Sequence, residues 1–250
     1  MLLQRLKPFV DAARSITGWE LAFAPEPLEP APPWDYEALA RGALAQAESA
    51  LDLGTGGGEA LERLLAFATC RAVATEPWHV NAPIAAARLG ARAPVVRASS
   101  LRLPFRSAAF DVVLARHEEI APDEVARVLT LAGRFLTQQV VHDVWPELAS
   151  VFPDMTRFPD HFVGYRDGLR AAGLVIDEAR VCRHRVRYRE LGHFVYHLAA
   201  AAPWILPHFD LETHAEALAE LERWALRDDG VILTEGFTLI RARMEARPSA

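Results

Sequence analysis

The chain has 250 residues, of which 51% are hydrophobic and 24% are charged, a composition typical of globular proteins. The length predicts one large domain, or one domain with a small addition. The net charge of −6 argues against a general nucleic-acid-binding protein, which usually has a basic domain. Residues 198–206, the most apolar stretch, are far fewer than the ~20 that span a bilayer. Residues 1–18 lack the apolar core of a signal peptide, so we expect a soluble, cytoplasmic protein with no membrane partner.

The N-terminal segment is predicted to contain two helices joined by a linker. Residues 2–13 have the pattern of a short amphipathic helix. Five prolines follow within residues 25–33, and because proline cannot continue a helix, this stretch is expected to be extended. Asp35 is a plausible N-cap for a helix that runs to about residue 46.

From residue 49 onward, short apolar runs alternate with stretches of helical periodicity. Strands are predicted at residues 49–53, 71–75, 94–97, 110–115 and 133–141, and helices at 59–68, 84–89 and 122–131. Strands separated by helices indicate βαβ units, and therefore a parallel sheet with helices on both faces.

The last third of the chain has a different pattern. Two long strands are predicted, at residues 174–188 and 231–244. One helix is expected before them, at residues 161–172, and two between them, at residues 190–202 and 211–226. This arrangement suits an antiparallel hairpin on one edge of the sheet.

A glycine-rich loop follows the first predicted strand, in the run Leu-Asp-Leu-Gly-Thr-Gly-Gly-Gly-Glu at residues 51–59. Glycine permits a tight turn and lets the backbone approach a ligand closely. The spacing is not that of a dinucleotide-binding fingerprint, because Glu59 or Leu61 stands where the last glycine is needed, and the lysine of a Walker loop is absent. The carboxylates of Asp52 and Glu59 would also repel a phosphate. The loop therefore favours a ligand without phosphates.

The pattern Asp-x-Gly-x-Gly-x-Gly at residues 52–58 resembles motif I of class I S-adenosylmethionine (SAM)-dependent methyltransferases. Two further stretches carry the resemblance. Glu76 ends the second predicted strand, 24 positions after Asp52, in the run Val-Ala-Thr-Glu-Pro. Leu-Pro-Phe at residues 103–105 precedes Phe-Asp-Val-Val-Leu at residues 110–114. The resemblance covers about residues 51–141 and looks like a little-characterised bacterial branch of the family. SAM has a sulfonium and an ammonium group, so an acidic loop suits it.

The resemblance implies which residues contact the cofactor. An ionised Glu76 can accept hydrogen bonds from both ribose hydroxyls. Ser99 stands where the family has an adenine-contacting Asp, which shifts that expected contact toward the backbone of Ser100 and Leu101. The expected SAM-binding residues are Tyr36, Asp52, Gly54, Thr55, Gly56, Gly58, Glu76, Pro77, Ser99, Ser100, Leu101, Arg116 and His117.

The candidates for catalysis follow the fourth core strand, in the run Arg-His-Glu-Glu at residues 116–119. Placing the acceptor at the methyl carbon supplies much of the rate, and a base is needed only when the acceptor must lose a proton. His117 is the most plausible base because its ordinary pKa is near neutral. The alternative is a loop histidine that orients the cofactor. Asn-Pro-Pro-Tyr-like residues are absent here, which argues against methylation of adenine or of a protein amide.

Taken with the resemblance, these patterns predict an α/β fold: a Rossmann-like, seven-stranded, mostly parallel sheet with helices on both faces and a late antiparallel hairpin. Residues 1–48 would form a helical cap and linker over the cofactor, and residues 49–250 the methyltransferase domain. Within that domain, residues 49–141 would bind the cofactor and residues 142–250 would face the acceptor. A SAM-dependent methyltransferase acting on a small molecule is the expected function, with S-adenosylhomocysteine (SAH) as the product. No metal site is expected, since no tight His/Cys cluster occurs.

Two other functions stay open on this evidence. One is an RNA methyltransferase that uses the alternating arginines Arg183, Arg185, Arg187 and Arg189, which otherwise form a solvated, charged strand. The other is a SAM-binding module that transfers no methyl group, since Ser99 replaces the adenine-contacting Asp. The acceptor, the methylated atom and the oligomeric state are not predicted by the sequence.

Overall fold

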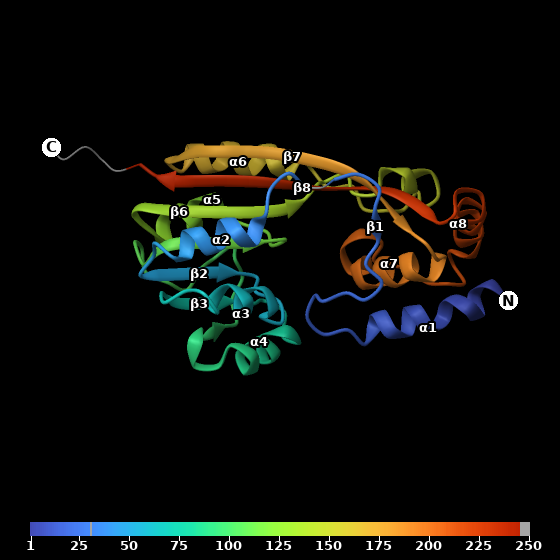
Figure 1. Ribbon diagram of the computed structural model, residues 1–250, viewed down its shortest axis with the longest axis horizontal. Coiled ribbons are helices and arrows are strands. Elements are labelled where there is room, and N and C mark those ends of the chain that lie inside the picture. The colour runs from blue at the N-terminus through green and yellow to red at the C-terminus, as the bar shows by residue number, and fades with distance from the viewer. Residues whose placement is uncertain (31, 246–250) are drawn as a thin grey trace.

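A computed structural model describes residues 1–30 and 32–245. Within these residues, an eight-stranded mixed sheet in the order β1-β7-β8-β6-β5-β2-β3-β4 forms the centre of the molecule (Figure 1). The strands are β1 (Glu26–Pro27), β2 (Ser49–Leu53), β3 (Arg71–Thr75), β4 (Val95–Val96), β5 (Phe110–Arg116), β6 (Leu129–Val140), β7 (Leu174–Tyr188) and β8 (Val231–Met244). Strands β6, β5, β2, β3 and β4 run parallel, and β8 lies antiparallel between β6 and β7. The predicted parallel core and late hairpin are confirmed.

Helices cover both faces of the sheet. They are α1 (Leu2–Arg14), α2 (Tyr36–Leu44), α3 (Glu59–Leu65), α4 (Asn81–Leu89), α5 (Pro122–Val128), α6 (His161–Ala171), α7 (Leu191–Ile205) and α8 (Ala215–Asp228), with 3-10 turns η1 (Gly90–Arg92) and η2 (Pro146–Ser150). The predicted cap is present, since the Asp35 carboxylate accepts a hydrogen bond from the Ala38 amide at 2.9 Å. Apolar residues of α2 and α3 pack on one face of the parallel core, and those of α5 and α6 pack on the other.

The prediction of seven strands is corrected to eight, because part of the proline-rich linker joins the sheet. Glu26 and Pro27 pair antiparallel with Arg187 and Val186 of β7, and the Leu28 amide donates to the Arg185 carbonyl at 2.9 Å. The prolines keep this segment extended, which leaves its remaining backbone groups free to pair with the exposed edge of β7. Proline is tolerated in an edge strand because the N–H group that it lacks is not needed on the side that faces away from the sheet.

The predicted helix at residues 122–131 is shorter than expected. It ends at Val128, and β6 begins at Leu129. Ala132 adopts a left-handed φ of 63°, and the pairing of β5 with β6 shifts register between Phe110 and Val112. This bulge lets β6 start earlier, so Leu129 pairs with Phe110 in the sheet instead of continuing the helix.

The β7–β8 hairpin extends well past the end of β6 and supports a second group of helices. The ladder between β7 and β8 continues to Tyr188 and Val231, whereas β6 pairs with β8 only as far as Val140 and Phe237. Beyond this point α1, α7, α8 and η2 pack on the hairpin around a separate apolar cluster (Figure 1). We call this part the helical lobe. Helix α1 lies against α7, so residues 15–24, called here the crossing segment, connect the lobe back to the parallel core.

Candidate functional site

The glycine loop lies between the end of β2 and the start of α3, at the carboxyl edge of the parallel strands. Gly54, Gly56 and Gly58 have φ values of +61°, +62° and +84°, a region that residues with a Cβ rarely adopt. Gly58 is the N-cap of α3. The Thr55 amide donates to the Thr75 carbonyl at 2.9 Å, which ties the loop to the end of β3. The strand–loop–helix arrangement needed for close approach of a ligand is therefore present.

Glu76 lies at the end of β3 directly beside this loop. Its two carboxylate oxygens accept hydrogen bonds from the Gly56 amide at 2.7 Å and the Trp78 amide at 2.9 Å. The side chain is buried, and burial raises its pKa although the two amides favour the charged form. Each oxygen keeps a second lone-pair direction, so Glu76 can accept further hydrogen bonds from a ligand.

Asp52, Tyr36 and Arg116 come from β2, α2 and β5 and meet beside the loop. Removal from water raises the pKa of Asp52 to about 7, although the Arg116 charge opposes this rise. Burial and the Asp52 charge raise the pKa of Tyr36 above its ordinary value. The Arg116 guanidinium lies 5.8 Å from the centre of the Tyr36 ring. The structure therefore brings together three of the expected cofactor contacts.

His117 follows β5 in a left-handed conformation with a φ of 58°. Its ring stacks on Phe237 of β8 with the ring centres 5.6 Å apart. Trp34 donates to Gln138 Oε1 at 2.9 Å, and Gln138 Nε2 lies 3.4 Å from His117 Nε2. Solvent reaches the imidazole, yet the surrounding protein and the Arg116 charge lower the pKa of His117. The imidazole is therefore neutral at pH 7.

The residues expected around adenine lie at the ends of β3 and β4. Pro77 is exposed directly after Glu76, and Ser99 is exposed with its hydroxyl accepting from the Leu101 amide at 3.2 Å. Leu101 is also exposed. Ser100 is buried and turns away, since its hydroxyl donates to Glu118 Oε1 at 2.7 Å. Of Ser100, therefore, only the backbone groups are available for the expected contact with adenine.

Two residues at the loop were not among the expected cofactor contacts. The Glu118 carboxylate lies against Gly54, where an added Cβ would clash with it, and burial raises the pKa of Glu118. Trp19 lies against Gly56, and an added Cβ there would be 2.7 Å from Trp19 Cδ1. Glu118 was detectable from its place after His117. Trp19 was not, because it is a lone aromatic in an irregular segment.

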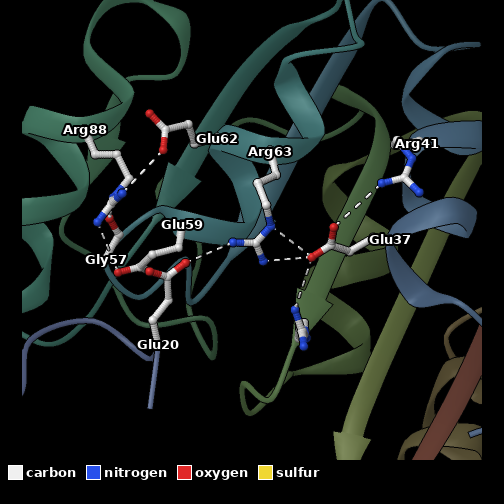
Figure 2. Close-up of polar contacts among 9 residues, drawn as sticks. Glu20, Glu37, Arg41, Gly57, Glu59, Glu62, Arg63 and Arg88 are labelled. Atoms are coloured by element: carbon white, nitrogen blue, oxygen red, sulfur yellow. Dashed lines mark hydrogen bonds and ion pairs between the residues drawn. The ribbon is translucent and has the colours of Figure 1, made fainter. Parts of the chain in front are cut away.

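The crossing segment is held to the parallel core by polar contacts. The Gly18 amide donates to Asn81 Oδ1 at 3.1 Å. Arg63 of α3 pairs with Glu20 of the segment at 3.2 Å and with Glu37 of α2 at 2.8 Å, as Figure 2 shows. These ion pairs are exposed and add little stability individually, but they fix where the segment crosses the loop.

The other end of the crossing segment contacts the helical lobe. His197 Nε2 lies 2.8 Å from the Ala22 carbonyl, and Phe23 stacks on His193 with ring centres 4.5 Å apart. Trp19 itself lies 5.3 Å from Trp204 of α7 and 6.5 Å from Trp78, measured between ring centres. The segment therefore joins the glycine loop to α7.

Several buried polar atoms near the loop have no hydrogen-bond partner among the described residues. They are Tyr36 Oη, Thr55 Oγ1, Thr75 Oγ1, Asn81 Nδ2 and Arg116 Nε. Leaving such a group unpaired costs about 1–3 kcal/mol, so a cluster of them marks a position for a polar ligand. The carboxylates of Asp52, Glu76 and Glu118 suit a cationic ligand such as SAM and disfavour a phosphate. Glu118 and Trp19 must shift before any ligand can lie against Gly54 and Gly56.

The alternating arginines of β7 do not form a free cationic surface, since each guanidinium lies within hydrogen-bond or ion-pair distance of a carboxylate. The pairs are Arg183–Asp143 at 2.7 Å, Arg185–Glu29 at 2.7 Å, Arg187–Asp229 at 3.7 Å and Arg189–Glu26 at 2.7 Å. Glu26 belongs to β1 and Glu29 follows it closely, so their ion pairs help to hold this strand at the sheet edge.

Among the described residues, no group of three or more His, Cys, Asp or Glu side chains is arranged to hold a metal ion. Across the same part of the chain, no helix has the length and apolarity needed to cross a membrane.

A family model matches part of the chain. Residues 51–139 match a family model described as "Methyltransferase domain". No curated protein matches the chain.

Solved structures share the fold over nearly the whole chain. A functionally unknown protein from Deinococcus radiodurans has a TM-score of 0.62 and 17% identity, covering 95% of this chain and 99% of its own. The [4+2]-cyclase SpnF has a TM-score of 0.59 and 19% identity, covering 98% and 93%. Geranyl diphosphate C-methyltransferase from Streptomyces coelicolor, solved with Mg²⁺, geranyl-S-thiolodiphosphate and SAH, has a TM-score of 0.54 and 12% identity, covering 97% of both chains.

Proposed function

We propose that this chain is a class I SAM-dependent methyltransferase, which uses SAM as its cofactor and methylates a small-molecule acceptor. The acidic glycine loop carries the proposal. Three carboxylates and several partnerless polar groups surround a left-handed backbone that glycine adopts most readily, which suits a cationic, hydrogen-bonding ligand. A neighbour solved with a small-molecule acceptor analogue supports the acceptor class.

We assign the cofactor contacts as follows. Glu76 accepts hydrogen bonds from the ribose hydroxyls while it holds the Gly56 and Trp78 amides. Asp52 faces the ammonium group, and the unpaired Tyr36 hydroxyl and Arg116 Nε face the carboxylate of the methionine portion. The remaining contacts divide between the methionine side, with Gly54, Thr55, Gly56, Gly58 and His117, and the adenine side, with Pro77, Ser99, Ser100 and Leu101.

His117 is the proposed catalytic residue. Bound SAM supplies an electrophilic methyl group on its sulfonium. Phe237 stacking and the Gln138 amide fix the imidazole, and its lowered pKa keeps it neutral and ready to accept a proton. A base with a lowered pKa is weak, so it suits a proton that becomes acidic as the acceptor atom gains the methyl group.

The test is titration calorimetry of the intact protein with SAM and SAH, with ATP and NAD as phosphate-bearing controls. We expect SAM and SAH to bind and the two controls not to bind. Incubation with methyl-labelled SAM and a low-molecular-weight cell extract then shows whether label enters a small molecule. A folded protein that binds neither SAM nor SAH contradicts the proposal.

A second candidate is a SAM-binding protein that transfers no methyl group. It is favoured by the neighbour described as a [4+2]-cyclase and by the weak basicity of His117. SAH binding without any transfer of label supports this candidate over the first. We do not propose RNA as the acceptor, because the arginines of β7 are paired with carboxylates.

A further inference from the structure

Glu235 occupies the part of β8 that extends past the carboxyl ends of β5 and β6. Val140, at the end of β6, pairs with Phe237, and Glu235 lies two residues farther along β8. Because side chains alternate along a strand, Glu235 is on the same face as Phe237, which stacks on His117. Two residues of strand span about 7 Å. Ligands of open α/β sheets bind beyond the carboxyl ends of the strands, so Glu235 lies at the edge of the sheet where such a ligand would bind.

The Glu235 carboxylate is fixed by two donors that use the same oxygen. Tyr188 Oη donates to Glu235 Oε1 at 2.9 Å, and Trp145 Nε1 donates to it at 3.1 Å. Both donor side chains are buried in the helical lobe. Among the described residues, Oε2 has no hydrogen bond and the carboxylate has no ion pair. One oxygen is therefore held rigidly while the other is left for a partner.

His184 supplies an independent sign of a binding site at the same place. It is directly opposite Glu235 in the β7–β8 ladder, so both side chains lie on one face of the hairpin. Its ring stacks near Phe237, with centres 6.0 Å apart. The His184 side chain is 7% exposed, and its Nδ1 has no hydrogen-bond partner among the described residues. A buried ring nitrogen without a partner beside a fixed carboxylate indicates a polar ligand.

The remaining surroundings of Glu235 are aromatic. The Tyr188 ring contacts His197 of α7, with centres 5.1 Å apart, and Trp145 packs on Phe194 at 5.3 Å. A carboxylate among aromatic faces is the environment that recognises an ammonium group, through an ion pair and cation–π contact. The same carboxylate repels a phosphate or carboxylate on the acceptor.

We propose that Glu235, fixed by Tyr188 and Trp145, binds an amine group of the acceptor, so that the acceptor is an amine on an apolar frame rather than a phosphorylated or carboxylated molecule. Glu235 is thereby a positioning residue that selects the acceptor and does not itself touch the transferred methyl. This inference rests on the proposed function for the identity of the reaction, but binding of the amine can be measured without it.

The experiment compares amines with carboxylates of matching shape. Tryptamine is paired with indole-3-propionate, and phenethylamine with 3-phenylpropionate, and each is titrated into SAH-saturated protein by saturation-transfer NMR. Wild type is compared with Glu235→Gln, which keeps an acceptor for Tyr188 and Trp145 but removes the charge. Glu178→Gln, on the same hairpin and paired with Arg180 and Arg241, is the control.

We expect the amines to bind wild type and the Glu178→Gln control more tightly than their carboxylates. In Glu235→Gln, amine binding should weaken by about 10- to 100-fold while SAH affinity is retained. Tyr188→Phe, which frees the carboxylate from one donor, should weaken amine binding to a smaller extent.

Equal binding of amines and carboxylates to wild type, or amine binding unchanged in Glu235→Gln, overturns the assignment. If Glu235→Gln does not fold, unchanged amine binding in Tyr188→Phe overturns it instead. The same titrations without SAH separate the two failures. Wild type that binds the amines in this series but shows no SAH binding would uphold the Glu235 site and contradict the proposed methyltransferase function.

Discussion

Replacing Asp52 by Asn should stabilise the protein while weakening cofactor binding. Asp52 lies at the end of β2 beside Glu76, Glu118 and Arg116, and its removal from water raises its pKa to about 7. Asparagine has nearly the same shape as protonated aspartic acid but never carries the charge. The substitution therefore removes the cost of ionising a partly buried carboxylate, together with the negative charge that we assign to the cofactor's ammonium group.

The size and sign of the stability change follow from the pKa. Asp52 has a folded pKa near 7 against an ordinary value of 3.8, so between these pH values the folded protein binds a proton that the unfolded chain has lost. The contribution of Asp52 to wild-type stability therefore falls as pH rises from about 4 to 7 and levels off above that range. The full pKa difference of Asp52 corresponds to roughly 4 kcal/mol of unfolding free energy. Partial contact of the carboxylate with solvent lowers this to about 2–3 kcal/mol.

The assay is urea unfolding of both proteins at several pH values between 4 and 8.5. Asp52→Asn should be about equal to wild type at pH 4 and more stable by about 2–3 kcal/mol at pH 8, because groups far from Asp52 titrate alike in both proteins. Calorimetry at pH 8 should show SAH binding weakened by at least about ten-fold, the loss of one charge-assisted contact. A stability difference that does not change with pH would refute the reasoning about Asp52.

Three further predictions concern the loop and the arginines. Gly56→Ala should weaken SAH binding by about ten-fold or more and lower the free energy of unfolding by about 1–2 kcal/mol, because the φ of Gly56 is +62° and the new Cβ would be 2.7 Å from Trp19. Gly42→Ala, with open space around its Cβ, is the control, and equal SAH affinity in the two variants would contradict this prediction. Glu76→Gln should lower stability by about 1–3 kcal/mol in urea unfolding, because its one carbonyl oxygen can accept from only one of the Gly56 and Trp78 amides and leaves the other unpaired. The variant should also bind SAH more weakly, and wild-type SAH affinity would show that Glu76 is not the ribose contact. Filter binding should detect no salt-sensitive binding of a structured RNA between 50 and 150 mM salt, because the arginines of β7 are paired with carboxylates. RNA affinity that falls steeply across this range would favour an RNA substrate.

Features that depend on local pattern were predictable from the sequence. The strand, glycine loop and helix at residues 49–65 follow from hydrophobic periodicity and from glycines at positions that require positive φ. The two long strands β7 and β8 were predicted with their observed bounds, because alternation over more than ten residues is a strong signal. The register bulge in β6 and the pairing of β1 were not predicted, since both depend on a neighbouring strand that local sequence does not specify.

The sequence by itself therefore determined the parallel core and the acidic glycine loop, and through Asp52 and Glu76 it led us to expect a cationic ligand. Only the tertiary structure decided that Trp19 lies on Gly56, that Glu118 lies on Gly54 and that Glu235, Tyr188 and Trp145 meet beyond the carboxyl ends of the strands. The physical reason is distance along the chain. Trp145 and Glu235 are 90 residues apart, and their contact depends on how far the β7–β8 hairpin extends past β6, which no local periodicity encodes.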